Sequence, residues 1–214
     1  MTPAEFLTQT ALGAADAVRW GAPINARAAA AHAANETGYG RSQLGRSPHY
    51  NLFGVKATGV TTPHWHGTSV TMPTWEVVNG QRVNVDAAFR SYESYAHAFM
   101  DYGDVINRVY PHAVLRSGDP NGFLAGLFLT GPRKWATDPQ AFDKAARIMG
   151  MYSGTLDEAL TMSDPDEATV VVLTDLSWAD RLGVLLRSPA VLRGSFVHRY
   201  REREDGGRLD VRRA

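Results

Sequence analysis

The sequence contains no cysteine among its 214 residues. This absence excludes disulfide bonds, thiol nucleophiles and zinc–thiolate sites. There is no excess of charge either, because Lys plus Arg and Asp plus Glu number 22 each, so neither nucleic acid nor a membrane surface is predicted as a partner. No hydrophobic run is long enough to span a bilayer. The 44% hydrophobic content is sufficient for one packed domain with an extension.

The first residues lack the basic and apolar regions of a secretory signal, so we expect any export to use another route. They predict a helix instead. Thr2 fits an N-cap, Pro3 a first helical position and Glu5 the acidic member of a capping box. This helix is predicted to extend to about Val18.

A second predicted helix is rich in alanine and runs from about Ala26 to Glu36. Gly38 and Gly40 end it, since glycine adopts backbone angles that other residues resist. Small side chains let other elements approach closely, so we expect this helix to be central and Glu36 to be partly removed from water. Partial desolvation favours the protonated form of a carboxyl group, which a general acid needs. The alternative is a solvated Glu36 in the last turn.

The pattern becomes β-prone at residues 70–72, 74–78 and 82–85. Asn79-Gly80, between the last two segments, is a strong signal for a tight hairpin turn. We therefore expect a small β-hairpin that protrudes from a helical body.

Helical patterning resumes at Ser91. Large side chains there recur at spacings of three and four, which predicts a core-facing stripe rather than a cofactor site: Tyr95, Phe99, Tyr102, Ile106 and Val109. Asp119-Pro120 and Asp138-Pro139 each fit the start of a helix with Asp as the N-cap. These helices are predicted to end near Gly131 and Tyr152.

The composition changes along the last third of the chain. Residues 148–180 contain acidic but no basic side chains, whereas the last sixteen residues are rich in arginine. We expect a domain of residues 1–152 followed by an extension of residues 153–214, with a strand at 170–173 and a helix at 177–187. The extension is too small to bury a core of its own, so we expect it to dock on a protein partner.

Two carboxylates are candidates for acid–base chemistry. Glycosidic cleavage needs an acid that protonates the leaving oxygen and usually a second carboxylate that activates water or stabilises positive charge. Glu36 is the candidate acid, and Glu76 is its candidate partner because it lies on the first strand of the predicted hairpin. A solvated surface role for Glu76 is the alternative. His64 and His66 have the spacing of two metal ligands, but without Cys or a carboxylate cluster we predict neither a metal site nor a cofactor.

Six segments, in order, resemble the glucosaminidase domains of glycoside hydrolase family 73, which include those of flagellar rod-cap proteins and autolysins. That family has a similar alanine-rich helix ending in Glu-x-Gly-x-Gly. The resemblance covers roughly residues 1–152 and is carried by residues 31–40, 50–57, 65–67, 74–76, 89–92 and 136–139.

The resemblance implies a lysozyme-like α+β fold, mainly helical with a small β-hairpin lobe, that hydrolyses the β-1,4 bond after N-acetylglucosamine in peptidoglycan. It implies that Glu36 is the general acid and Glu76 the base or charge stabiliser. It also implies cleft-lining or glycan-contacting roles for a further set: Tyr39, Asn51, Phe53, Trp65, Tyr92, Trp135 and Asp138. Aromatic side chains suit the apolar faces of pyranose rings.

The chain departs from the family at two positions. Lys134-Trp135 stands where the family commonly has Gly-Tyr, and an indole cannot donate a phenolic proton. His32 stands where a Gln is usual, which changes the hydrogen bonding behind Glu36.

Two other functions remain open. A muramidase or lytic transglycosylase, which cuts the other glycosidic bond, uses a similar architecture. A structural, glycan-binding component of a wall-crossing assembly is the alternative from another class, and Trp135 favours it. We expect action in the periplasm or cell wall after delivery by a phage tail, a flagellar rod or a similar apparatus.

Overall fold

The computed structural model describes residues 1–58, 61–78 and 80–163. Within these ranges the chain forms helices and one antiparallel two-stranded sheet, with the following bounds: α1 (Pro3–Arg19), α2 (Ala26–Thr37), β1 (Ser69–Val78), β2 (Gln81–Arg90), α3 (Tyr95–Val109), α4 (Pro111–Val114), α5 (Pro120–Phe128), α6 (Ala141–Met151) and α7 (Ser153–Met162). The predicted α+β class, mainly helical with one hairpin, is confirmed. No helix in the described ranges is long and apolar enough to cross a membrane.

The first helix begins as the sequence predicts. The Thr2 side chain accepts a hydrogen bond from the Glu5 N–H (3.2 Å), and the Glu5 carboxylate accepts one from the Thr2 N–H (2.7 Å). This reciprocal pair satisfies two donors that a helix start would otherwise leave free. The helix ends at Arg19, one residue beyond the predicted end.

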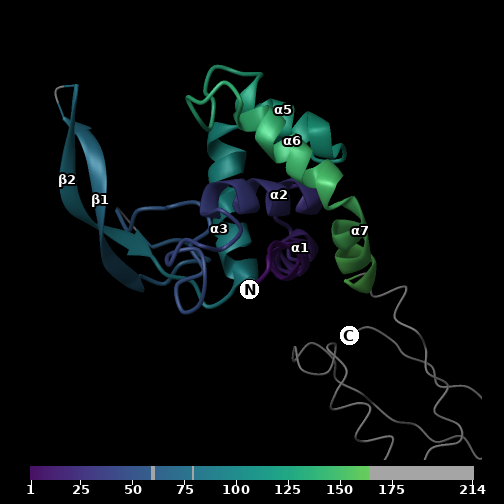
Figure 1. The fold of residues 1–214 in the computed structure, drawn as a ribbon, viewed down its shortest axis with the longest axis horizontal. Helices are drawn as coiled ribbons and strands as arrows, with labels where there is room; N and C mark the ends of the chain where they lie inside the picture. The colour runs from purple at the N-terminus through teal and green to yellow at the C-terminus, as the bar shows by residue number, and fades with distance from the viewer. Residues whose placement is uncertain (59–60, 79, 164–214) are drawn as a thin grey trace, which may run out of the picture. The chain divides into compact units, whose positions relative to one another are not determined.

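Helix α2 lies at the centre of the helical body. Every side chain from Ala28 to Ala34 is buried, and α2 packs against α1, α5 and α6 (Figure 1). Asn25 caps its first turn, and Gly38, in the left-handed conformation, ends it. The predicted central position of this helix is confirmed, and the central position brings Glu36 to the last turn of a packed element.

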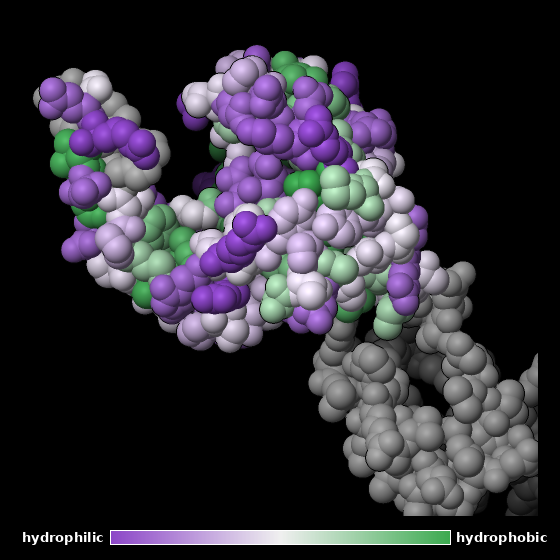
Figure 2. All heavy atoms as spheres, in the orientation of Figure 1, coloured by the Kyte–Doolittle hydropathy of each residue, from purple (hydrophilic) through white to green (hydrophobic). Residues whose placement is uncertain are grey.

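The hairpin extends away from the helices (Figure 1). Val78 pairs with Gln81, so the connection comprises two residues as the sequence predicts. Strand β2 runs five residues further than expected, to Arg90. Side chains near the turn of β2 are exposed, whereas Phe89 and Arg90 are buried where the strand meets the helical body. Figure 2 shows an open hollow between the hairpin and the helices.

Two further differences from the predicted boundaries bear on the site and on the domain limits, and the first is the start of α6. This helix begins at Ala141 rather than at Asp138. The Asp138 carboxylate instead accepts a hydrogen bond from the Gln140 N–H (2.9 Å) in a turn before the helix, and Lys144 binds its other oxygen (2.7 Å). The Asp side chain therefore closes a local turn that competes with helix initiation.

The second is the expected domain boundary at residue 152, which falls inside the helical unit. Helix α7 follows directly and packs on α1, with Leu156 and Ala159 buried. Arg27 forms an ion pair with Asp157, and the Arg19 guanidinium donates to the Ser163 carbonyl. Residues 153–162 therefore belong to the folded body. The strand expected at 170–173 and the helix expected at 177–187 lie outside the described residues.

Gly126 should tolerate no side chain, because α5 crosses the backbone of α4 there. A Cβ atom at Gly126 would lie 2.4 Å from the N and Cα atoms of Ala113. We expect Gly126→Ala to lower the free energy of unfolding by about 1–3 kcal/mol, as overpacking commonly does. Urea denaturation followed by circular dichroism measures this change.

Gly150→Ala is the matched control. Gly150 lies in α6, and a Cβ atom at this position would have no neighbouring atom within 4 Å. Alanine should therefore raise stability by up to about 1 kcal/mol through helix propensity. Equal effects of the two substitutions would contradict the close approach of α4 and α5.

Candidate active site

Glu36 is held by a hydrogen bond from within its own helix. Its side chain is 29% exposed, and its Oε1 atom lies 3.2 Å from Nε2 of His32, one turn earlier. Among the described residues no other hydrogen bond to the Glu36 carboxylate is found. The carboxylate is therefore anchored on one oxygen and accessible to solvent in part, which suits a group that exchanges a proton with a substrate.

Four aromatic rings surround His32, whose side chain is fully buried. Their centroids lie 4.9–5.8 Å from the imidazole centroid, and together they form what we call the aromatic enclosure: Phe53, Tyr102, Phe128 and Trp135. Phe53 stacks on Tyr102 at 4.0 Å, and Trp135 meets Phe53 edge-on at 5.7 Å. Two predicted site residues, Phe53 and Trp135, are thus brought together around the histidine that contacts Glu36.

Sequence reasoning missed the polar contact between Tyr102 and His32. Its hydroxyl lies 3.0 Å from Nδ1 of His32, on the side of the ring away from Glu36. Burial, with the nearby Glu36 as a smaller cause, raises the pKa of Tyr102 well above its ordinary value. The only sequence signal was its place in the α3 stripe, which predicts burial but not a polar partner.

Tyr39 takes a left-handed backbone conformation (φ +59°) directly after Gly38. A non-glycine residue in this region carries strain, and such strain is often found at functional sites. Its ring packs against Tyr152, with centroids 5.8 Å apart, and burial raises its pKa. The structure thereby places a half-buried phenol three residues after Glu36.

A family model matches most of this fold. The glucosaminidase model, described as mannosyl-glycoprotein endo-beta-N-acetylglucosaminidase, matches residues 14–154. The chain belongs to the glucosaminidase family.

Individual relatives agree with this assignment. The chain is 40% identical over 131 residues to the peptidoglycan hydrolase FlgJ of Pseudomonas aeruginosa, covering 58% of this chain and 31% of that protein. It is 36% identical over 131 residues to a probable N-acetylmuramidase of Lactococcus lactis subsp. lactis, covering 58% of this chain and 28% of that protein. This chain therefore spans less than a third of either curated relative.

A solved structure is similar as well. The catalytic domain of the autolysin Auto from Listeria monocytogenes matches with a TM-score of 0.60 and 26% identity, over 77% of this chain and 89% of that one. The lysozyme-like α+β fold expected for this glucosaminidase domain is confirmed.

Asn51 fixes the turn that carries Phe53. Its side chain is 2% exposed. Its amide nitrogen donates to the carbonyls of Val55 (2.9 Å) and Arg90 (2.8 Å), and its amide oxygen accepts from the Val55 N–H (2.9 Å). These bonds hold the turn that carries Phe53 against the end of β2. A direct contact between Asn51 and a glycan stays a prediction, and its burial disfavours it.

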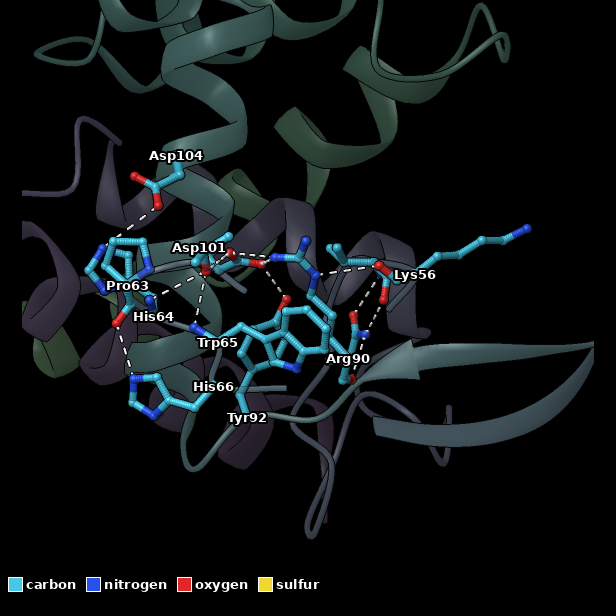
Figure 3. A network of polar contacts seen from close by, with 12 residues as sticks. Lys56, Pro63, His64, Trp65, His66, Arg90, Tyr92, Asp101 and Asp104 are labelled. Atoms are coloured by element: carbon cyan, nitrogen blue, oxygen red, sulfur yellow. Dashed lines mark hydrogen bonds and ion pairs between the residues drawn. The ribbon is translucent and has the colours of Figure 1, made fainter. Parts of the chain in front are cut away.

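Trp65 and Tyr92 lie in a separate buried cluster at the base of the hairpin (Figure 3). The Arg90 guanidinium donates to both oxygens of Asp101 (2.8 and 2.9 Å) and lies 4.4 Å from the ring centre of Trp65. The Tyr92 hydroxyl donates to Asp101 at 2.6 Å. We call Trp65, Arg90, Tyr92 and Asp101 the base cluster. In the described ranges no hydrogen bond or ring contact joins it to Glu36 or His32.

The remaining candidates are placed as follows. Asp138 lies in the exposed turn before α6, paired with Lys144. Glu76 is in β1, where its backbone pairs with Val83, and its side chain lies outside what the structure describes. In the described ranges no group of three or more His, Asp or Glu side chains is placed to hold a metal ion, and His64 instead lies 3.8 Å from Asp104.

We expect the free energy of unfolding to depend on pH above about 10 because of Tyr92 in the base cluster. Burial and the Asp101 carboxylate raise the pKa of Tyr92 well above the value of about 10 for an unfolded tyrosine. The unfolded chain therefore loses this proton first, and stability that is fully present below pH 10 falls as pH rises. We expect Tyr92→Phe to reduce that slope by up to about 1.4 kcal/mol per pH unit.

The measurement is urea unfolding of both proteins between pH 6 and 11.5. Between pH 6 and 8, where neither state ionises a tyrosine, the two stability curves should run parallel, offset by the hydrogen bond lost to Asp101. Identical slopes above pH 10 would show that Tyr92 does not hold its proton more tightly in the folded state.

Proposed function

We propose that this glucosaminidase domain hydrolyses the β-1,4 bond after N-acetylglucosamine in peptidoglycan, with Glu36 as the general acid. The observation that carries the proposal is the anchoring of Glu36 in a chain of this family. One carboxylate oxygen meets buried His32, and the side chain keeps 29% of its surface open. A carboxyl group fixed on one side and open on the other can direct its proton to a leaving oxygen.

Glu76 is proposed as the second carboxylate, acting as base or charge stabiliser. It lies in β1, two residues before the end of that strand. The hollow between hairpin and helical body supports a binding site for an extended glycan, with β1 as one wall (Figure 2). The Asn51 turn supports the same location, because it connects the hairpin base to Phe53 in the aromatic enclosure.

Two rival functions have some support. The similarity to a probable N-acetylmuramidase favours cleavage of the other glycosidic bond of peptidoglycan. Trp135, which brings an indole rather than a phenol to the aromatic enclosure, favours a component that binds glycan with little turnover. Product analysis separates the glucosaminidase from both rivals. Enzymes that cut the two glycosidic bonds release fragments with different ends, and a glycan-binding component releases almost no fragments.

The proposed setting is the bacterial cell wall, either the periplasm or the wall itself. Similarity to FlgJ and to an autolysin supports it. We further propose that residues 164–214 bind a protein of a wall-crossing assembly such as a flagellar rod or phage tail. Because α7 belongs to the folded body, the proposed docking segment begins after it rather than at residue 153.

Glu36→Gln tests the acid. We expect release of muropeptides from purified sacculi to fall by about 100-fold or more, since general acid catalysis typically contributes that much. Mass spectrometry of the wild-type products should find reducing N-acetylglucosamine. Glu158→Gln, an exposed carboxylate in α7, is the matched control and should retain wild-type release.

The other outcomes point to the rivals. Reducing muramic acid indicates a muramidase and an anhydro ring a transglycosylase. Binding to sacculi without release by the wild type contradicts catalysis and supports the structural function.

The docking segment is tested by comparing the full chain with residues 1–163. Both versions are expressed in the host that carries the assembly. We expect assembly proteins to co-purify with the full chain but not with residues 1–163. Equal amounts of assembly proteins co-purified with both versions would show that residues 164–214 are not the docking segment.

A further inference from the structure

We infer that His32 is a positioning residue that determines which oxygen of Glu36 carries the catalytic proton. In this inference the neutral imidazole carries its proton on Nε2, which faces Glu36. The Tyr102 hydroxyl favours that tautomer because it donates to Nδ1 on the opposite side of the ring. The inference rests on the proposed role of Glu36 as the general acid.

The two polar contacts of the imidazole favour this tautomer. When Glu36 is ionised, its carboxylate has no proton to give, and Nε2 of His32, 3.2 Å from Oε1, is then the donor. A neutral imidazole carries one N–H, and its other nitrogen must then accept. That nitrogen, Nδ1, lies 3.0 Å from the Tyr102 hydroxyl. Because burial raises the pKa of Tyr102 well above its ordinary value, the phenol keeps its proton and can donate it.

The aromatic enclosure restricts the imidazole to this orientation. Phe53, Phe128 and Trp135 meet it at centroid distances of 5.2, 5.1 and 4.9 Å, the last two nearly edge-on. With the ring fully buried, the two polar contacts available to it in the described ranges are Tyr102 and Glu36. The imidazole therefore connects one buried hydroxyl to one partly exposed carboxylate.

A defined tautomer gives the two oxygens of Glu36 different functions. When Glu36 is protonated, the Nε2–H of His32 occupies Oε1, so the proton resides on Oε2. That proton passes to the glycosidic oxygen while the C–O bond breaks and its electron pair stays on that oxygen. The carboxylate that forms keeps its hydrogen bond from His32, which strengthens because its acceptor is now charged. The contact thus stabilises charge that develops in the transition state, which raises kcat rather than substrate affinity.

Kinetics of three variants test the contact. His32→Met removes the donor, and we expect kcat to fall by about 100-fold with KM within a factor of about three, as for loss of one preorganised donor. His32→Gln keeps an N–H donor of similar reach, so kcat should recover to within about 10-fold of wild type. Tyr102→Phe leaves the donor in place but no longer selects the tautomer, and an intermediate kcat is expected. His112→Met, at an exposed position in α4, is the matched control.

A measurement without substrate keeps the inference testable even if a variant folds poorly. Long-range proton–nitrogen NMR of the histidine rings in the wild-type protein should show His32 protonated on Nε2 and not on Nδ1. Protonation on Nδ1, or on both nitrogens, overturns the inference.

The two proposals fail in different ways. Wild-type kcat in His32→Met, together with an inactive Glu36→Gln, overturns the role of His32 and leaves the acid intact. Full activity of Glu36→Gln overturns the acid itself, whatever tautomer the NMR spectrum shows. A KM that rises in His32→Met with unchanged kcat assigns His32 to substrate affinity and also contradicts the inference.

Discussion

The close approach of other helices to α2 is the constraint on which the rest of the domain depends. Alanine at most positions from 28 to 34 leaves α2 without long side chains, and α1, α5 and α6 pack against it with every one of these side chains buried. Burying a polar side chain in such an interior costs free energy unless the side chain forms hydrogen bonds there. His32 is the exception in this run, and it has two partners: Tyr102 on one nitrogen and Glu36 on the other. The packed helix therefore carries its own polar connection from the core to the surface.

A second interaction positions the hairpin. Arg90, the last residue of β2, is 8% exposed and binds Asp101 of α3, which is 1% exposed. A buried ion pair needs further hydrogen bonds to offset its desolvation, and Asp101 also accepts from Tyr92 and from Thr62. The same end of β2 accepts a hydrogen bond from Asn51 through the Arg90 carbonyl. The hairpin is thus fastened at its base to α3 and to the turn that follows Asn51, while its far end extends beside the open hollow (Figure 2).

Sequence reasoning was accurate where the signal is local. The capping box at Thr2, the end of α2 at Gly38 and the two-residue hairpin connection were all predicted, because each depends on residues a few positions apart. It was less accurate at Asp138, where two local hydrogen-bonding arrangements compete for one side chain. Helix α7 was missed for another reason, since a change in composition after residue 152 coincides with no break in packing.

The sequence by itself determined the class of the fold, the family and the position of Glu36 on the last turn of α2. These follow from caps, periodicity and motif order, which are properties of neighbouring residues. Only the tertiary structure decided which side chains form the hydrogen-bonded connection from Glu36 into the core. His32 and Tyr102 are 70 positions apart, and their contact exists because α2 and α3 bring the two side chains together inside one aromatic enclosure. Likewise, a glycan-contacting role for Trp65 and Tyr92 stays a prediction, and only the tertiary structure shows that both are partners of buried Arg90 and Asp101 at the base of the hairpin.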